Sequence, residues 1–213
     1  MARKTKKEAQ ETRENILDAA EDCFLEHGLS RTGLEAIAAR AGVTRGAVYW
    51  HFKNKDEVLE AMVNRVTVPF LHGLERVSRA EGTTPLRDLR ELLRQSFADL
   101  GHDGRMRNAL EVIELRSEIA SEGDAISTLR QAGMRRTHAR ILAAFARAAV
   151  LDQLRDGVTA EHSARSLHFM IFGALRMYLL DPTHIDLERD GLAAVDLVLR
   201  AVARDPGLLD VPR

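Results

Sequence analysis

The sequence is poor in residues that form disulfides or interrupt helices. It contains one cysteine, 5 prolines and 14 glycines among 213 residues. This scarcity of helix breakers, with many alanines, leucines, arginines and glutamates, predicts a fold that is nearly all helical. Cys23 cannot form an intramolecular disulfide, and its spacing from Ile16, Ala20 and Phe24 on one helical face indicates a small buried side chain. A redox-sensing thiol is the alternative interpretation of Cys23.

Several absences weigh against an enzyme, a metal site or a bound cofactor. The eight histidines are scattered, and neither an HExxH motif nor a Cys-x-x-Cys pair occurs. Glu111, Glu114 and Glu118 share one helical face, but the Glu-x-x-His partner of di-iron proteins is missing, so we interpret them as a solvated or salt-bridged face. No glycine-rich phosphate loop is present. We therefore expect no catalysis, no metal and no cofactor.

The sequence also lacks the signals of a membrane protein. No apolar run approaches the ~20 residues that a membrane-spanning helix needs. The first residues are charged and polar, unlike a signal peptide. We expect a cytoplasmic protein that does not bind membranes.

The positive charge is local rather than global. The formal net charge is only -1, which does not suit a uniformly basic nucleic-acid coat. Residues 1–7 carry four basic residues and no acid, and residues 31–55 carry five basic residues against the single acid Glu35. A basic footprint within a neutral protein suits operator binding, because contacted phosphates release counterions.

Residues 32–55 predict a helix, a tight turn, a second short helix and a basic exit loop. Thr32 and Glu35 have the spacing of a capping box at the start of the first helix. Gly42 is placed to end that helix in a left-handed conformation, and Thr44 is placed to cap the next one. This is the plan of a helix-turn-helix, whose second helix enters the DNA major groove.

The second helix, at about residues 44–51, is expected to expose polar and aromatic side chains. Arg45 can fork onto guanine O6 and N7, whereas Gly46 lets the backbone approach DNA closely. Trp50 either packs on the sugar-phosphate backbone or closes the small core. An ordinary pair of bundle helices is the alternative. The predicted DNA contacts, which combine base reading with phosphate positioning, are Thr32, Thr44, Arg45, Gly46, Ala47, Tyr49, Trp50, His51, Lys53 and Lys55.

The helix-turn-helix segment resembles that of a known protein family. The run GVTRGAVYWHFKNK, from Gly42 to Lys55, is similar to the signature of the TetR family of bacterial transcriptional regulators. Together with residues 2–20 it looks like the AcrR and TtgR subgroup, local repressors of multidrug efflux pumps. The resemblance implies an all-α fold of about nine helices: an N-terminal three-helix helix-turn-helix DNA-binding domain and a C-terminal helical ligand-binding and dimerisation domain.

We expect a DNA-binding domain at residues 1–55, a ligand-binding and dimerisation domain at 56–205, and a loosely ordered tail at 206–213. A helix that begins near Asn54 connects the first two, and Pro69 either kinks this helix or ends it near Val68. The other predicted helices cover about 5–27, with Thr5 and Glu8 as a capping box, and then 85–100, 106–115, 124–155, 160–180 and 187–203.

The C-terminal domain supplies apolar walls with a few polar groups, as a pocket for hydrophobic drugs requires. Core packing is the alternative for each apolar residue. Glu114 and Arg176 differ, because a charge among apolar neighbours must be paired or hydrated. The predicted ligand-binding residues are Phe70, Leu93, Ser96, Phe97, Leu110, Glu114, Ile141, Phe145, His168, Phe169, Phe172 and Arg176.

The resemblance also implies a homodimer formed by the last two long helices. Residues 166–180 are apolar on more than one face, which exceeds what a one-sided surface helix requires. A two-fold dimer would present two reading helices to a pseudo-palindromic operator of double-stranded DNA. The sequence departs from the subgroup at Phe172-Gly173 and Tyr178, where relatives often carry an Asp-Gly pair and a tryptophan.

Three functional hypotheses follow. The leading one is a repressor of an efflux operon that a small hydrophobic inducer releases from DNA by a population shift. The second is a family member that controls metabolism in response to an acyl or aromatic metabolite. The third is an architectural DNA-binding protein without an inducer, which predicts a filled C-terminal core.

Overall fold

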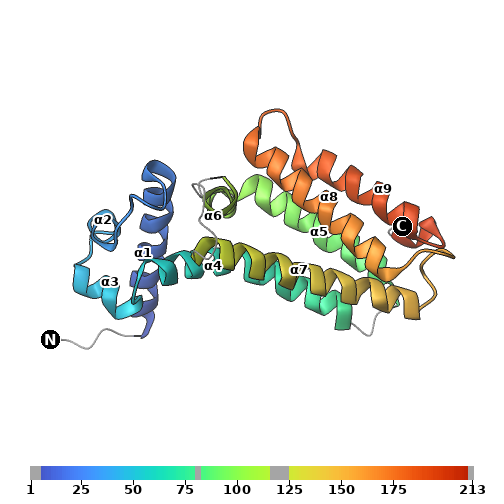
Figure 1. Ribbon diagram of the computed structural model, residues 1–213, viewed down its shortest axis with the longest axis horizontal. Helices are drawn as coiled ribbons and strands as arrows, with labels where there is room; N and C mark the ends of the chain where they lie inside the picture. The colour runs from blue at the N-terminus through green and yellow to red at the C-terminus, as the bar shows by residue number, and fades with distance from the viewer. Residues whose placement is uncertain (1–5, 80–82, 116–124, 211–213) are drawn as a thin grey trace. The chain divides into compact units, whose positions relative to one another are not determined.

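A computed structural model describes residues 6–79, 83–115 and 125–210 (Figure 1). Within these ranges the chain is all-α, as predicted. No described helix is long and apolar enough to span a membrane. The nine α-helices of the described ranges are α1 Lys6–His27, α2 Leu34–Arg40, α3 Arg45–His51, α4 Lys55–Arg79, α5 Pro85–His102, α6 Gly104–Glu114, α7 Ala125–Val150, α8 Ala160–Leu180 and α9 Leu192–Val202.

The chain divides into two compact units. The first unit comprises Met1–Val66 and Asn108–Arg130, and the second comprises Thr67–Arg107 and Gln131–Arg213. The boundary of the first unit therefore falls within α4. The domain division that we predicted between residues 55 and 56 stays a prediction based on sequence.

In the first unit, α1 forms the support against which α2 and α3 pack (Figure 1). Ile16 and Phe24 of α1, Ile37 of α2 and Val48 of α3 have no exposed surface. The helix α1 ends at Gly28, whose φ of 77° is left-handed, as the sequence predicted. The predicted capping residue Thr5 lies outside the described residues.

Arg40 fastens the end of α2 to the side of α1. Its guanidinium donates to Asp22 at 3.1 Å and to Glu26 at 2.9 Å. These hydrogen bonds hold the pKa of the Glu26 carboxyl below its usual value. The short helix α2 thus has a charged attachment in addition to its apolar contacts.

The helix α4 begins with a reciprocal cap. Asn54 Oδ1 accepts a hydrogen bond from the Glu57 backbone at 2.8 Å, and Glu57 Oε2 accepts one from the Lys53 backbone at 2.8 Å. The helix then continues through Pro69 to Arg79. The alternative that Pro69 ends this helix near Val68 is therefore wrong.

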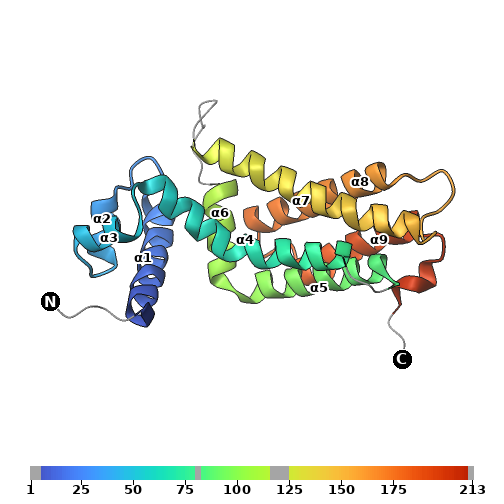
Figure 2. The same ribbon diagram turned by 90° about the horizontal axis from the view of Figure 1, so that it is seen from below.

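The second unit is a helical bundle in which α5 and α8 both pack against α9 (Figure 2). Its interior is apolar, with Leu89, Leu93, Ile141, Phe145, Leu167 and Leu199 fully buried. The helix α7 stops at Val150, earlier than predicted, because Asp152 adopts a left-handed φ of 54° and the Gln153 backbone donates to Ala148. The segment predicted as one helix at 187–203 is a π-helical turn, Leu187–Gly191, followed by α9.

The prediction of a loosely ordered tail is wrong up to Asp210. A 3-10 helix covers Pro206–Leu209, and the Leu209 side chain is fully buried. Arg87 Nε of α5 donates to the Leu208 carbonyl at 2.8 Å. Arg200 of α9 also lies 2.7 Å from Asp210, so the segment is docked by a buried leucine, a backbone hydrogen bond and an ion pair.

Candidate nucleic-acid interface

The turn between α2 and α3 has the geometry that the sequence predicted. Gly42 has a φ of 64°, and its N–H donates to the Ala39 carbonyl at 3.2 Å. The next N–H, of Val43, donates to the Ala38 carbonyl at 3.0 Å. These two bonds satisfy carbonyls at the end of α2 and turn the chain sharply into α3.

Thr44 caps α3, as predicted. Its Oγ1 accepts a hydrogen bond from the Ala47 backbone at 3.2 Å. On the inner side, Val48 is fully buried and Phe52 is nearly so. Cap and core contacts together fix which face of the seven-residue helix points outward.

Thr32 does not belong to this outward face, and its prediction as a DNA contact is corrected. Only 2% of Thr32 is exposed, and its hydroxyl donates to the Gly28 carbonyl at 2.8 Å and lies 3.1 Å from the Cys23 carbonyl. The predicted capping box with Glu35 does not form, because α2 begins at Leu34 with Gly33 as its N-cap and no side-chain cap. The Thr32 hydroxyl joins the α1–α2 turn to α1 instead.

The outward face of α3 carries two large aromatic side chains. Trp50 is 73% exposed and Tyr49 is 45% exposed. Trp50 therefore does not close the core, which leaves the other predicted role, packing on the DNA backbone. His51 is half-buried, and Trp50 meets its ring at a right angle with centroids 4.5 Å apart.

Gly46 lies on the same face, and no close contact within the described residues prevents a side chain at this position. A Cβ built there meets only Thr44 Oγ1, at 3.9 Å, which is ordinary contact. Glycine in a helix is less stable than alanine by about 0.5–1 kcal/mol. Contacts among the described residues therefore do not require glycine at position 46.

Two lysines follow α3, and they differ. Lys53 is 87% exposed, with Glu57 Oε1 at 3.7 Å from its ammonium. Lys55 is partly buried and donates to the Leu29 carbonyl at 2.5 Å. Lys55 therefore also ties the start of α4 to the end of α1, whereas Lys53 extends into solvent.

Arg45 is held in place on the surface of the unit. Its Nη2 lies 2.9 Å from Glu35 Oε1 and 3.4 Å from the Tyr49 hydroxyl, and its guanidinium carbon lies 5.4 Å from the Tyr49 ring centre. The bond to Tyr49 and the charge of Glu35 raise the pKa of Arg45 above its usual value. The side chain is nonetheless 62% exposed, so a base edge can reach it.

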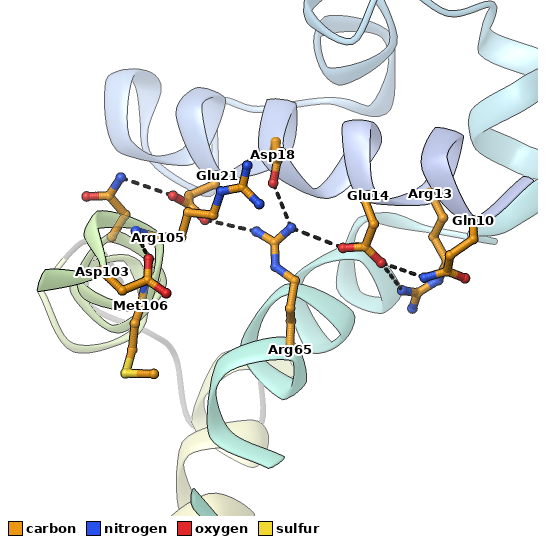
Figure 3. A network of polar contacts seen from close by, with 10 residues as sticks. Gln10, Arg13, Glu14, Asp18, Glu21, Arg65, Asp103, Arg105 and Met106 are labelled. Carbon is orange, nitrogen blue, oxygen red and sulfur yellow. Dashed lines mark hydrogen bonds and ion pairs between the residues drawn. The ribbon is translucent and has the colours of Figure 1, made fainter. Parts of the chain in front are cut away.

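A charged cluster that sequence reasoning missed lies between α1 and α4 (Figure 3). Arg65 of α4 lies 2.6 Å from Asp18, 3.2 Å from Glu21 and 3.4 Å from Glu14. The signal was present, because residues 14, 18 and 21 follow the i, i+4, i+7 spacing of one helical face. What the sequence did not indicate is which cation meets that face.

Glu21 is the buried member of this Arg65 cluster. Its side chain is only 5% exposed, and its other oxygen accepts a hydrogen bond from Asn108 of α6 at 3.0 Å. Burial lowers the pKa of Arg65, but the hydrogen bond and charge of Asp18, with Glu14 and Glu21, outweigh burial and raise it. Arg65 therefore remains charged.

The predicted ligand-binding residues differ in how deeply they are buried. Leu93, Phe97, Ile141 and Phe145 are core residues of the second unit, each at most 4% exposed. Ser96 is partly buried and donates to the Leu92 carbonyl at 2.7 Å. The partly exposed members, which are not fixed in that core, are Phe70, Leu110, His168 and Phe172.

Glu114 and Arg176, the two charged residues among the predicted ligand-binding residues, differ in their exposure. The Glu114 side chain is 11% exposed, and Arg130 lies 3.4 Å from it in the same unit, as a charge among apolar neighbours requires. Arg176 is exposed, so the argument from burial that placed it in a pocket fails. Phe169 is also 68% exposed.

His168 stacks on His138 with ring centres 5.5 Å apart. Burial, and then the neighbouring His138, lower the pKa of His168 below its usual value. Within the described residues, no group of three or more possible metal ligands comes together.

A hollow of about 480 Å³ lies in the first unit and does not involve the predicted ligand-binding residues. It is lined mainly by charged and polar side chains, among them Arg13, His51 and Asn64. Arg13 also lies over the Phe52 ring at 5.1 Å. A polar lining of this kind is unlike the apolar walls that a hydrophobic ligand needs.

Cys23 is buried in the first unit, and 3% of it is exposed. Burial is the largest influence on its thiol, and it raises the pKa. A raised pKa disfavours the reactive thiolate, so the structure favours the small buried side chain over the redox sensor.

Comparison with known proteins decides the family. Residues 16–62 match the sequence profile of bacterial regulatory proteins of the tetR family. The HTH-type transcriptional regulator TtgR of Pseudomonas putida is 38% identical over 209 residues, covering 98% of this chain and 99% of TtgR. This chain belongs to the TetR family. Regulators of this family bind operator DNA and form dimers, and they are not enzymes.

Solved structures of TetR-family repressors match this chain along most of its length. SmeT, the repressor of the Stenotrophomonas maltophilia multidrug efflux pump SmeDEF, was solved with triclosan; that structure is 47% identical, covers 95% of this chain and 98% of its own, and has a TM-score of 0.87. NalD, the secondary repressor of the MexAB-OprM multidrug efflux pump in Pseudomonas aeruginosa, is 35% identical, covers 92% and 99%, and has a TM-score of 0.81. The similarity thus extends over both units.

Proposed function

We propose that this TetR-family protein represses a multidrug efflux operon and leaves its operator when a small hydrophobic ligand binds. The observation that carries the proposal is the outward face of α3, where Arg45, Gly46, Tyr49 and Trp50 are presented together by a capped helix. The relatives SmeT and NalD, which repress efflux pumps, support the choice of regulated genes.

On DNA, α3 enters the major groove. Arg45 forks onto a guanine, because its exposed guanidinium matches the O6 and N7 acceptors. The aromatic and basic side chains around it contact sugar and phosphate, which position the helix without reading sequence. The proposed DNA contacts are Thr44, Arg45, Gly46, Ala47, Tyr49, Trp50, His51, Lys53 and Lys55.

The proposed dimer forms through α8 and α9. Phe169, Met177 and Leu180 of α8 and Leu197 of α9 are between 57% and 74% exposed in the single chain. Large apolar side chains on neighbouring helices form the kind of surface that a partner covers. A two-fold dimer then presents two α3 helices to the half-sites of a pseudo-palindrome.

The proposed ligand is small and hydrophobic and binds in the C-terminal helices. Apolar side chains from several helices supply walls of the required kind, and the partly exposed Phe70, His168 and Phe172 can adjust to a ligand more readily than the packed core can. The SmeT structure contains triclosan, a compound of this class, which supports the ligand type.

The test is fluorescence anisotropy of the dimer on the DNA upstream of its own gene, with scrambled DNA as control. Triclosan and a panel of hydrophobic antibiotics are then titrated into the complex. We expect specific binding that several unrelated compounds reverse. Equal binding to both DNAs would refute the operator-binding function, and specific binding that no compound reverses would refute drug-released repression.

A further inference from the structure

Glu35 is the single acid of residues 31–55, and it lies directly beside the expected base-reading side chain. It stands in the first turn of α2, and its Oε1 is 2.9 Å from Arg45 Nη2. Both side chains are more than half exposed, at 58% for Glu35 and 62% for Arg45. A pair this exposed adds little to the stability of the fold, so its presence at the DNA face calls for another role.

Tyr49 is the second residue that contacts the Arg45 guanidinium. The guanidinium carbon lies 5.4 Å from the ring centre, and Nη2 is 3.4 Å from the Tyr49 hydroxyl. The polar contacts of Arg45 with described residues thus both use Nη2. Nη2 carries two N–H groups, so one of them stays on Glu35 while the other, released from the longer contact with Tyr49, forms a fork with the parallel N–H of Nη1 on a guanine.

We infer that Glu35 is a positioning residue that gives Arg45 its power to discriminate between bases. The inference rests on the proposed function, in which Arg45 reads a guanine. A free arginine side chain samples many rotamers and loses that freedom when it binds a base. Glu35 limits those rotamers before DNA arrives, so the correct base gains from a fork already aimed outward.

The charge of Glu35 has a separate effect. A carboxylate at the DNA face repels phosphates of any sequence, so it lowers the affinity for operator and scrambled DNA alike. This repulsion cancels in the ratio of specific to non-specific affinity. The ratio rises only through the positioning of Arg45.

The matched control removes an equal charge elsewhere in the same unit. Asp56 is exposed in the first turn of α4 and is not in contact with Arg45. D56N, like E35Q, takes away one negative charge. If charge alone matters, both variants will tighten binding to every DNA alike and leave the affinity ratio unchanged.

The experiment measures affinity for the operator and for scrambled DNA by anisotropy in the wild type, E35Q, D56N, R45A and the E35Q/R45A double variant. We expect E35Q to lower the affinity ratio about five- to tenfold, a part of what one bidentate arginine–guanine contact provides. D56N keeps the wild-type ratio. In the R45A background, E35Q changes the ratio less than twofold, because there is no longer an arginine to position.

Each contrary outcome has a distinct meaning. A wild type that does not distinguish the two DNAs overturns the proposed function itself. With a discriminating wild type, an unchanged ratio in E35Q overturns the inference, as does an equal fall in D56N or a full fall in the R45A background. Thermal melting checks that each variant is folded, and E35A replaces E35Q with the same expectations if E35Q is not.

Discussion

Both compact units contain apolar cores and charged pairs at helix crossings, but the charged pairs differ in size. In the first unit Arg40 lies on two carboxylates and Arg65 on three. In the second unit Arg90 of α5 lies on the single carboxylate of Asp196 of α9, and Phe145 and Leu167 are among the large side chains without exposed surface.

The difference between the charged contacts of the two units follows from the apolar surface that their helices can bury and from the role proposed for each unit. The seven-residue helices α2 and α3 of the first unit have little apolar surface to bury, so charged and capped contacts contribute a larger share to fixing their positions. Such contacts also fix directions, because an arginine fork accepts a carboxylate only in certain orientations. A reading helix needs direction, whereas a ligand-binding bundle needs apolar walls. Substitutions in each unit test this contrast, from the largest expected effect on the free energy of unfolding to the smallest.

The largest effect is expected for Phe145→Ala in the second unit. Phe145 is fully buried, so the substitution removes a large apolar side chain and leaves a cavity, which costs about 3–5 kcal/mol. Val150→Ala on the same helix is the control, because Val150 is 85% exposed, and it changes stability by less than about 0.5 kcal/mol. Urea unfolding measures both, and similar midpoints for the two variants would contradict an apolar basis for this unit.

The next effect is expected for Arg65→Met in the first unit. The substitution keeps the length of the side chain but removes the guanidinium that lies 3.2 Å from the nearly buried Glu21, at a cost of about 3 kcal/mol. Arg90→Met is a matched control in the second unit, because Arg90 is equally buried at 19% exposure but pairs with the single carboxylate of Asp196. We expect about 1.5 kcal/mol there.

Urea unfolding of these two arginine variants decides whether charged ties carry more weight in the first unit. Equal losses for the two variants would show that the number of carboxylates at the crossing does not matter.

A smaller effect is expected for Gly42→Ala. The residue at this position has a φ of 64°, and a Cβ there meets no atom within 4 Å. The cost is therefore that of a left-handed backbone alone, about 1–2 kcal/mol. Thermal melting measures it. An unchanged melting temperature would mean that the turn between α2 and α3 does not depend on this conformation.

The sequence predicted the α2–α3 region well where the decisive contacts are local. Gly42 and Thr44 act on groups at most three residues away, so their roles are visible in the order of residues. Thr32 shows the limit of prediction from local sequence. Its spacing from Glu35 is compatible both with a helix cap and with a buried hydroxyl. Its hydroxyl donates to the Gly28 carbonyl and lies near the carbonyl of Cys23, nine residues earlier, which comes within reach only when α1 and the turn pack together.

The second unit was predicted less well because its features depend on burial. Local rules favoured a kink or an end of the helix at Pro69 and a loosely ordered tail, yet α4 continues to Arg79 and Leu209 is fully buried. The pocket residues show the same limit, since Arg176 and Phe145 have similar apolar neighbours in the sequence but opposite exposure. Periodicity identifies a helix, but it does not identify which of its faces another helix covers.

The smallest effect on unfolding, and the sharpest separation of fold from function, is expected for Gly46→Ala. The added methyl contacts only Thr44 at 3.9 Å, and alanine favours a helix over glycine by about 0.5–1 kcal/mol. The variant should therefore melt at the same or a slightly higher temperature. Operator affinity should nonetheless fall at least about tenfold, because the methyl stands where the backbone of α3 approaches the groove.

Gly42→Ala gives the converse control for that experiment, since it loses stability through the backbone and not through a contact with DNA. If Gly46→Ala keeps both its stability and its operator affinity, the absence of a side chain at residue 46 has no role at the interface. If it loses stability instead, the reason for glycine lies within α3. A stable variant with weak operator binding leaves DNA as the partner that excludes the methyl group.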